Sequence, residues 1–217
     1  LTYLFTKYID ILVNVETIDL LTPLHITSLY NYTNIAELLL KHNDIDVNIQ
    51  NKNKDTPLHI ALINGYTEIA KLLLAREDIN VNIQNNNKDT PLHIAVTNGY
   101  TEIAELLLKH KDIMVNIQDN YKQTSLHIAV NNNNSDIVEL LLDVDNIYVD
   151  FIDRSGKTPL HIAVNNNNSY IIKLLSEPRY IYDNMANEFH DKYNKKTNKK
   201  GKSNKYTKKK SKKKSKK

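Results

Sequence analysis

Five histidines recur at a fixed interval along the chain, and imidazole is the commonest protein ligand for metal ions. Each follows the previous one by 34 residues: His25, His59, His93, His127 and His161. Neighbouring packed helices lie about 8–10 Å apart, whereas a zinc–nitrogen bond is about 2.0–2.1 Å long. One ion therefore cannot collect histidines from successive repeats. We expect these side chains to be structural, and the sequence predicts no metal site.

Each histidine belongs to a six-residue motif that can start a helix. The motif is TPLHIA at 56–61, 90–95 and 158–163, TPLHIT at 22–27, and TSLHIA at 124–129. Threonine is a preferred N-cap residue, and proline suits the first helical position. The histidine falls at the third helical position, where a side chain can reach back to the cap. The motif therefore predicts five short helices with a capping histidine.

The residues after each motif predict a turn, a second helix and a loop. The turn position holds only glycine or asparagine, which tolerate the left-handed backbone region. In the repeat at 56–89, Thr67 is expected to cap a second helix whose apolar side includes Ile69 and Leu73. The Asn-rich stretch 79–87 predicts a β-hairpin-like loop. The equivalent turn residues are Asn31, Gly65, Gly99, Asn133 and Asn167.

These motifs resemble the ankyrin repeat, whose signature is Thr-Pro-Leu-His-x-Ala with a period of about 33 residues. The resemblance implies an all-α solenoid of stacked helix-turn-helix units joined by β-hairpin-like loops. One departure is the residue two places before the motif threonine. It is glycine only at Gly156, while Lys54, Lys88 and Lys122 stand at the equivalent positions. We therefore expect those three hairpins to turn differently.

The 34-residue period divides the chain into repeats and two further segments. Its beginning aligns with the inside of a second helix, so we expect an incomplete first repeat whose outer face lacks a polar cap. The lysine-rich end has no apolar face to bury and is expected to be disordered. The predicted segments are a partial repeat at 1–21, repeats at 22–55, 56–89, 90–123 and 124–157, a shortened repeat at 158–178, a capping helix or linker at 179–194, and the tail at 195–217.

Composition argues against catalysis and against a membrane span. The chain has no cysteine, no Gly-rich phosphate loop and no glycine-flanked serine of the hydrolase type. No apolar run approaches the roughly 18 residues of a membrane helix. We therefore predict no catalytic residue and no cofactor. The expected protein is a monomer inside the cell, in the cytoplasm or nucleus.

The resemblance implies a protein partner bound on the concave face of the solenoid, by hairpin tips and first-helix ends. The large apolar residues Leu29, Tyr30, Ile63 and Tyr121 are the preferred anchors. A surface that binds no protein strongly remains the alternative. The implied contact residues are Leu29, Tyr30, Lys52, Asn53, Asp55, Ile63, Asn64, Asn86, Asn87, Asp89, Asn120, Tyr121, Gln123, Arg154, Ser155 and Lys157.

The charge distribution supports a rival hypothesis. Residues 192–217 contain fifteen of the chain's 29 basic residues and no acid, which leaves 14 basic and all 25 acidic residues in 1–191. Such a tail predicts weak, non-specific binding to nucleic acid or an anionic surface, or nuclear targeting. The acidic stretch 136–153 offers the tail an alternative target within the chain itself.

Overall fold

The computed structural model of the chain describes residues 12–177, and within this range it contains ten helices and no strand. The predicted all-α solenoid is confirmed. The chain divides into two compact units, 1–174 and 175–217, and the description below concerns the first. The helices are α2 (Pro23–Tyr30), α3 (Thr33–Leu40), α4 (Pro57–Ile63), α5 (Thr67–Leu74), α6 (Pro91–Thr97), α7 (Thr101–Leu108), α8 (Ser125–Asn131), α9 (Ser135–Leu142), α10 (Pro159–Asn165) and α11 (Ser169–Leu175). The expected linker at 179–194 and tail at 195–217 lie outside the described residues.

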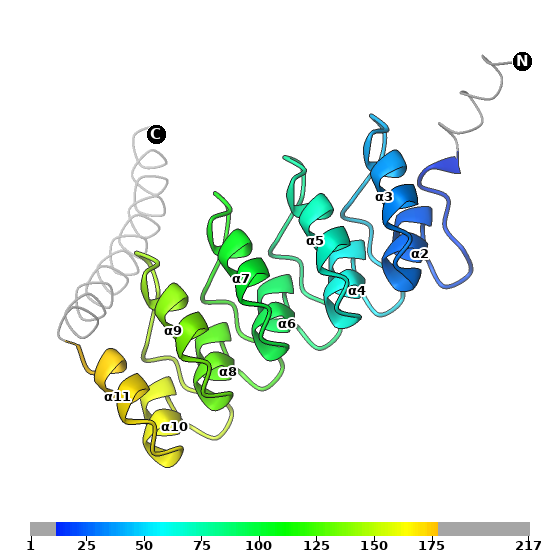
Figure 1. The fold of residues 1–217 in the computed structure, drawn as a ribbon. Coiled ribbons are helices and arrows are strands. Elements are labelled where there is room, and N and C mark those ends of the chain that lie inside the picture. The colour runs from blue at the N-terminus through cyan, green and yellow to red at the C-terminus, as the bar shows by residue number, and fades with distance from the viewer. Residues whose placement is uncertain (1–11, 178–217) are drawn as a thin grey trace, which may run out of the picture. The chain divides into compact units, whose positions relative to one another are not determined.

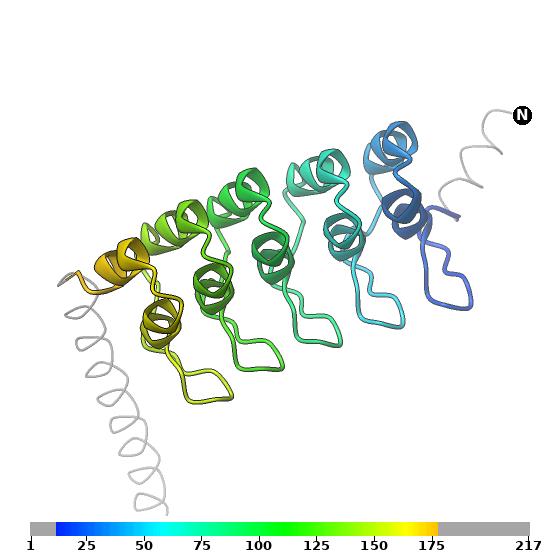
Figure 2. The same ribbon diagram turned by 60° about the horizontal axis from the view of Figure 1, so that its bottom comes forward.

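The helices form two layers (Figure 1). The even-numbered first helices pack on one another, and so do the odd-numbered second helices from α3 to α9. Leu58, Ile69 and Leu73 have no solvent exposure between these layers. Figure 2 shows the connecting loops projecting side by side from the first-helix layer. The core is therefore a thin layer of apolar side chains between the two helix layers, and each repeat is stabilised by its neighbours.

The predicted capping by histidine is confirmed at all five first helices. In α4, the backbone N–H of Thr56 donates to Nδ1 of His59 at 3.2 Å, and the N–H of His59 donates to the Thr56 hydroxyl at 3.4 Å. Two backbone donors that the first turn would leave unpaired are thereby satisfied. Capping boxes of this kind are formed by Thr22, Thr56, Thr90, Thr124 and Thr158.

The helix–helix turn is left-handed in every repeat, as predicted. Asn31 has φ 58° and Gly65 has φ 76°, and Gly99, Asn133 and Asn167 are also positive. The prediction for Thr67 was wrong, because Tyr66 is the N-cap of α5 and Thr67 is its first residue. Tyr66 makes no side-chain capping bond. After the left-handed turn, the N-cap of α5 lies one residue earlier than the preference for threonine at this position predicted.

The connecting loops, here called fingers, comprise residues 17–21, 51–55, 85–89, 119–123 and 153–157. We call the first residue of each the head and the fourth the tip. Lys54, Lys88 and Lys122 are tips with φ of 57–61°, and Gly156 has φ 73°. The expectation that the lysine hairpins turn differently was therefore wrong.

The head side chain explains why the turn tolerates lysine. The head Asn51 accepts two bonds at Oδ1, from the N–H groups of Asn53 and Asp55, at 2.8 and 3.0 Å. The same two acceptor bonds form in the other four fingers, including the first, where Thr17 is the head. These bonds hold the turn regardless of the residue at the tip.

Candidate protein-binding surface

A ladder of backbone hydrogen bonds joins successive fingers. The N–H of Asn86 donates to the carbonyl of Asn53 at 2.9 Å, and that of Asn120 donates to Asn87 at 3.0 Å. Equivalent bonds join Lys52 to Asp19 at 3.3 Å and Arg154 to Tyr121 at 2.8 Å. Because hydrogen bonds join each finger to the next, the finger backbone has little conformational freedom to lose when a partner binds.

The fingers and the exposed ends of the first helices form one continuous face, which we call the finger face. Most of the contact residues implied by the sequence are exposed on it. Leu29, Asp89, Asn120 and Gln123 are half-buried, and Asp55 is buried, so it supports the face from beneath. The exposed ones are Tyr30, Lys52, Asn53, Ile63, Asn64, Asn86, Asn87, Tyr121, Arg154, Ser155 and Lys157.

Large apolar side chains are exposed along this face. Tyr30, Ile63 and Tyr121 are 58%, 52% and 64% exposed, and Ile18 on the first finger is 87% exposed. The Tyr30 ring stacks on Tyr32 with centroids 5.9 Å apart. Aromatic and large apolar groups of this kind dominate binding energy at protein interfaces.

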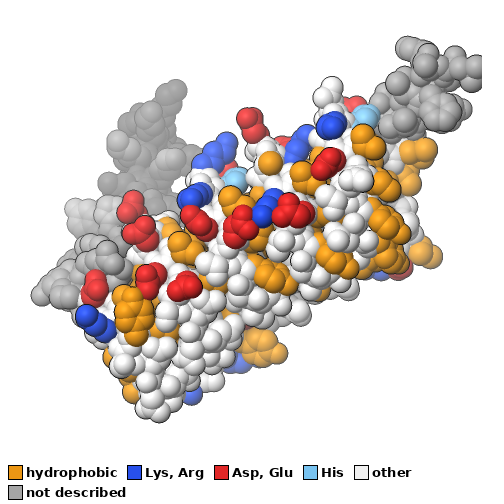
Figure 3. Space-filling model, in the orientation of Figure 1, with side chains coloured by type: hydrophobic (Ala, Val, Ile, Leu, Met, Phe, Trp, Pro, Cys, Tyr) orange, Lys and Arg blue, Asp and Glu red, His pale blue; other side chains and the backbone are white. Residues whose placement is uncertain are grey.

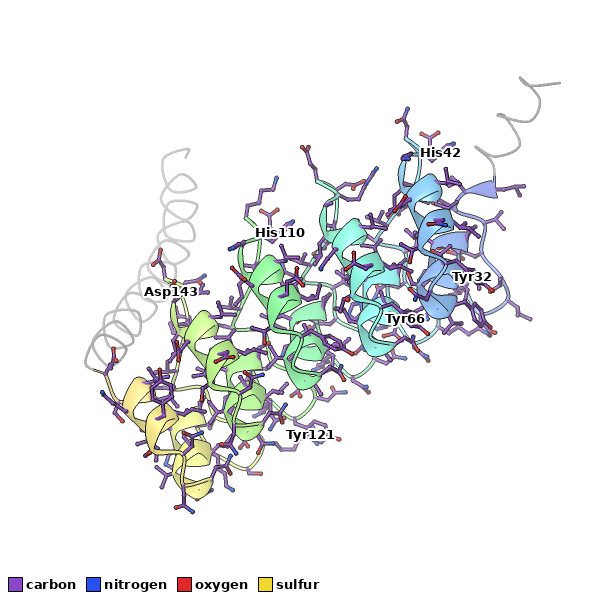
Figure 4. All side chains as sticks on the ribbon, in the orientation of Figure 1. Tyr32, His42, Tyr66, His110, Tyr121 and Asp143 are labelled. Atoms are coloured by element: carbon purple, nitrogen blue, oxygen red, sulfur yellow. The ribbon has the colours of Figure 1, made fainter. Side chains whose placement is uncertain are left out.

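A shallow hollow lies between the last two fingers. It is lined by Tyr121, Gln123, Asp153, Arg154 and Ser155 and has a volume of about 340 Å³. The Arg154 guanidinium lies 5.7 Å from the centroid of the Tyr121 ring, a cation–π contact. Figure 4 shows Tyr121 on the finger side of the molecule. The hollow thus brings together four of the predicted contact residues, Tyr121, Gln123, Arg154 and Ser155.

Four of the five motif histidines, His25, His59, His93 and His127, are buried beneath this face and engaged in hydrogen bonds, whereas His161 is exposed. Nε2 of His59 lies 3.1 Å from the carbonyl of Asp89 in the next finger, and His25, His93 and His127 make the equivalent bond. Nδ1 accepts from backbone, so Nε2 carries the hydrogen and donates. Burial lowers the pKa of these four histidines below its usual value, against the weaker opposing effect of the carbonyl bonds. They are neutral structural side chains.

The sequence analysis missed a set of asparagines on the opposite edge. Asn82 donates through Nδ2 to the carbonyl of Asp112 at 2.6 Å and accepts at Oδ1 from the N–H of Met114 at 2.9 Å. Each amide thus bridges two repeats. The recurring Val-Asn pair was the available signal, but it does not show what the side chain contacts. The equivalent residues are Asn14, Asn48, Asn82 and Asn116.

Acidic side chains gather over the second helices, away from the fingers (Figure 3). There Lys71 bridges Glu68 at 3.1 Å and Glu102 at 2.9 Å, which links α5 to α7. Glu37, Asp136 and Glu139 are also exposed on these helices. Acidic residues therefore outnumber basic ones on the second helices.

The described residues contain neither a metal-ligand cluster nor a helix that could span a membrane. No three His, Asp or Glu side chains between residues 12 and 177 gather as a metal ion would require. In the same range no helix is long and apolar enough to cross a membrane.

Stacked helix pairs with a preorganised row of loops define a helical-repeat scaffold, a class of protein that binds through its extended surface. A family model described as "Ankyrin repeats (3 copies)" matches residues 3–85, 24–119, 77–151 and 112–187. The chain belongs to the ankyrin-repeat family. Members of this family are generally protein–protein interaction modules and are typically non-catalytic. Among curated proteins, none matches the chain.

Proposed function

We propose that this protein is a monomeric, non-enzymatic scaffold that binds a protein partner across its finger face, the concave side of the solenoid. The exposure of Tyr30, Ile63 and Tyr121 on one face held by the backbone ladder carries the proposal. Exposed apolar groups on a rigid support lose little entropy on binding. The contact residues named from the sequence are the ones we expect the partner to touch, except the buried Asp55.

Selection from a displayed peptide library tests this proposal, with the full chain as bait. Selected peptides should bind the variant Tyr30→Ala/Ile63→Ala/Tyr121→Ala at least tenfold more weakly, because alanine at a hot spot costs about 2 kcal/mol or more. Isothermal titration calorimetry measures the change.

The matched control is Leu38→Ala/Met114→Ala. These side chains are 67% and 60% exposed but lie on α3 and on the loop after α7, away from the fingers. Selected peptides should bind this variant like the unaltered chain. If binding were lost in the control and kept in the finger-face variant, the partner would bind elsewhere and the proposal would fail.

A second candidate function is polyanion binding by the lysine-rich end. The fifteen lysines and absent acids in 192–217 favour it. Binding of a single-stranded oligonucleotide should then weaken with salt, with log K falling by about 0.7 per phosphate neutralised for each decade of salt. Deletion of 192–217 should abolish this binding and leave finger-face ligands bound. Retention of the same salt dependence after deletion would rule out this role for the tail.

A further inference from the structure

Three fingers carry an exposed lysine at the tip, at the same position in successive repeats. Lys54, Lys88 and Lys122 lie 34 residues apart. None of the three makes an ion pair with another residue in the described range 12–177. They place an exposed lysine without an ion-pair partner in that range at the same position of three successive fingers.

The turn itself does not require these lysines. Each has a positive φ near 60°, a region that glycine adopts without strain and that lysine adopts only at a cost. The fifth finger makes the same turn with Gly156, and the head side chain forms the same bonds in each case. Strained residues that local geometry does not demand are a reason to look for function.

The acids of the fingers do not neutralise the tip lysines. Asp55 and Asp119 are buried, and Asp89 and Asp153 are half-buried. Asp119 and Asp153 each use Oδ1 to hold their own turn. Asp19 is exposed but pairs with Lys52 at 3.0 Å. Arg154 and Lys157 add further exposed positive charge on the last finger. The exposed charged residues of the fingers are therefore mostly basic, although residues 1–191 as a whole are acidic.

We infer that the fingertips bind an acidic, extended segment of the partner protein; this inference rests on the proposed function and specifies its partner. Packed helices are separated by about 8–10 Å, and an extended segment in the polyproline II conformation advances about 3.1 Å per residue and presents every third side chain on the same face. Carboxylates on about every third residue of the segment would therefore match Lys54, Lys88 and Lys122 in turn.

An acidic protein segment fits the face better than nucleic acid. The same face exposes Ile18, Tyr30 and Ile63 beside the first fingers, and these side chains match apolar residues at one end of the segment. Single-stranded nucleic acid is generally held by rows of stacking aromatics. Tyr121 is the one tyrosine on the described fingers.

Fluorescence anisotropy with two labelled peptides of identical composition tests the inference in the full chain. One peptide carries glutamate at about every third position, and the other carries the same glutamates in one block. Both have leucines at one end. The test variant is Lys54→Gly/Lys88→Gly/Lys122→Gly, in which the turn conformation suits glycine. The control is Lys41→Gln/Lys109→Gln/Lys111→Gln, which removes the same charge from the second-helix side.

The spaced peptide should bind the test variant on the order of tenfold more weakly, because each exposed ion pair contributes a factor of about two to five. The control should change less than about twofold. The lysine-rich end is identical in all chains, so peptide bound by it makes the same contribution in the test and control variants. The blocked peptide should bind more weakly than the spaced one and respond less to the tip substitutions. Circular dichroism melting should show the test variant folded.

Equal weakening in the test and control variants would overturn the inference, since binding would then report net charge alone. Equal binding of the two peptides would overturn it as well, and so would a single-stranded oligonucleotide that bound more tightly than the spaced peptide and depended on the same tips. If library peptides needed Tyr30, Ile63 and Tyr121 but ignored the tips, this inference would fail and the proposed function would stand. If the library peptides depended neither on Tyr30, Ile63 and Tyr121 nor on the tip lysines, both this inference and the proposed function would fail.

Discussion

Nδ2 of Asn85 donates a 2.9 Å hydrogen bond to Oδ1 of Asp55, a residue 30 positions earlier in the chain, and both side chains are buried. The Oδ1 of the same amide holds the finger turn by accepting from Asn87 and Asp89. One repeat later the head is Asp119, which keeps the two acceptor bonds but has no N–H to offer Asp89. Burial, and then the charge of Asp119, raise the pKa of Asp89 to about 6.

Replacing Asp119 by asparagine should restore the missing bond. Asp119→Asn should raise the free energy of unfolding by about 1 kcal/mol near pH 7.5, the usual net value of such a bond. The gain should shrink below about pH 6, where Asp89 is already protonated in the folded chain. Urea unfolding at the two pH values measures this difference. The reverse change, Asn85→Asp, should destabilise the chain near pH 7.5, and a stabilising Asn85→Asp would contradict the account.

Acidification should destabilise the chain through its capping histidines. Burial lowers the pKa of His25, His59, His93 and His127 in the folded chain. Below about pH 6.5, the unfolded chain therefore binds more protons, and stability falls as the pH falls toward the lowered folded-state values. Each histidine contributes a slope of at most about 1.4 kcal/mol per pH unit. Urea midpoints between pH 7.5 and 5 follow this loss.

Asp89 acts in the opposite direction in part of this range. Its pKa is raised to about 6, so the folded chain takes up that proton more readily, and protonation of Asp89 stabilises the fold as the pH falls through 6. Because one aspartate opposes four histidines, acidification should still lower the free energy of unfolding. His93→Gln should reduce the pH slope. An unchanged slope would show that His93 does not titrate on unfolding in this range.

The strain at the tips can be measured directly. Lys54→Gly should raise the free energy of unfolding by about 1 kcal/mol, because the left-handed conformation costs a side-chain-bearing residue about 1–2 kcal/mol and glycine offsets part of this in the unfolded chain. Gly156→Lys should lower it by a similar amount. A Cβ at Gly156 has no heavy atom within 4 Å, so its effect reports backbone strain without a clash. Thermal melting of the two variants should shift in opposite directions.

Leu92 lies inside a repeat and Asn86 lies on its surface, so substitutions at the two positions should differ in their effect on stability. Leu92 is 1% exposed between the helix layers, so Leu92→Ala should cost about 2–5 kcal/mol. Asn86 is exposed on a finger, and Asn86→Ala should stay within about 0.5 kcal/mol. Chemical denaturation followed by circular dichroism measures both. Comparable costs would mean that the finger contributes to stability as much as the core.

The asparagine bridges on the far edge should also matter for stability. Asn82→Ala removes the donor to the Asp112 carbonyl and the acceptor for the Met114 N–H, and should cost about 1–3 kcal/mol. Asn34→Ala, at an exposed position in α3, provides a control with little expected effect. If urea denaturation gave the two variants the same free energy of unfolding, water would be replacing the bridge at no cost.

Local features of this fold could be predicted from the sequence because their causes lie within a few residues. The capping of His59 by Thr56 and the left-handed Gly65 each depend on neighbours in the same turn. The bridge from Asn82 to Asp112 and the bond between Asn85 and Asp55 join residues 30 apart. They become visible only when the repeats are stacked in register. Lys54 is a different case, because the Asn51 side chain that holds its left-handed turn lies in the same finger, and the residue types alone did not show that Asn51 accepts from the backbone of the turn.

Every hydrogen bond described between repeats joins positions about one period apart, from 30 residues at His59 and Asp89 to 36 at Arg76 and Leu40. An in-frame duplication of a 34-residue window among the middle repeats would therefore place the new side chains at the same spacing from their neighbours as the present hydrogen-bond partners. Deletion of one window would rejoin the survivors equally well. The length of the finger face can thus change by whole 34-residue repeats. Recombination within such a gene can lengthen the face while keeping the same contacts between neighbouring repeats.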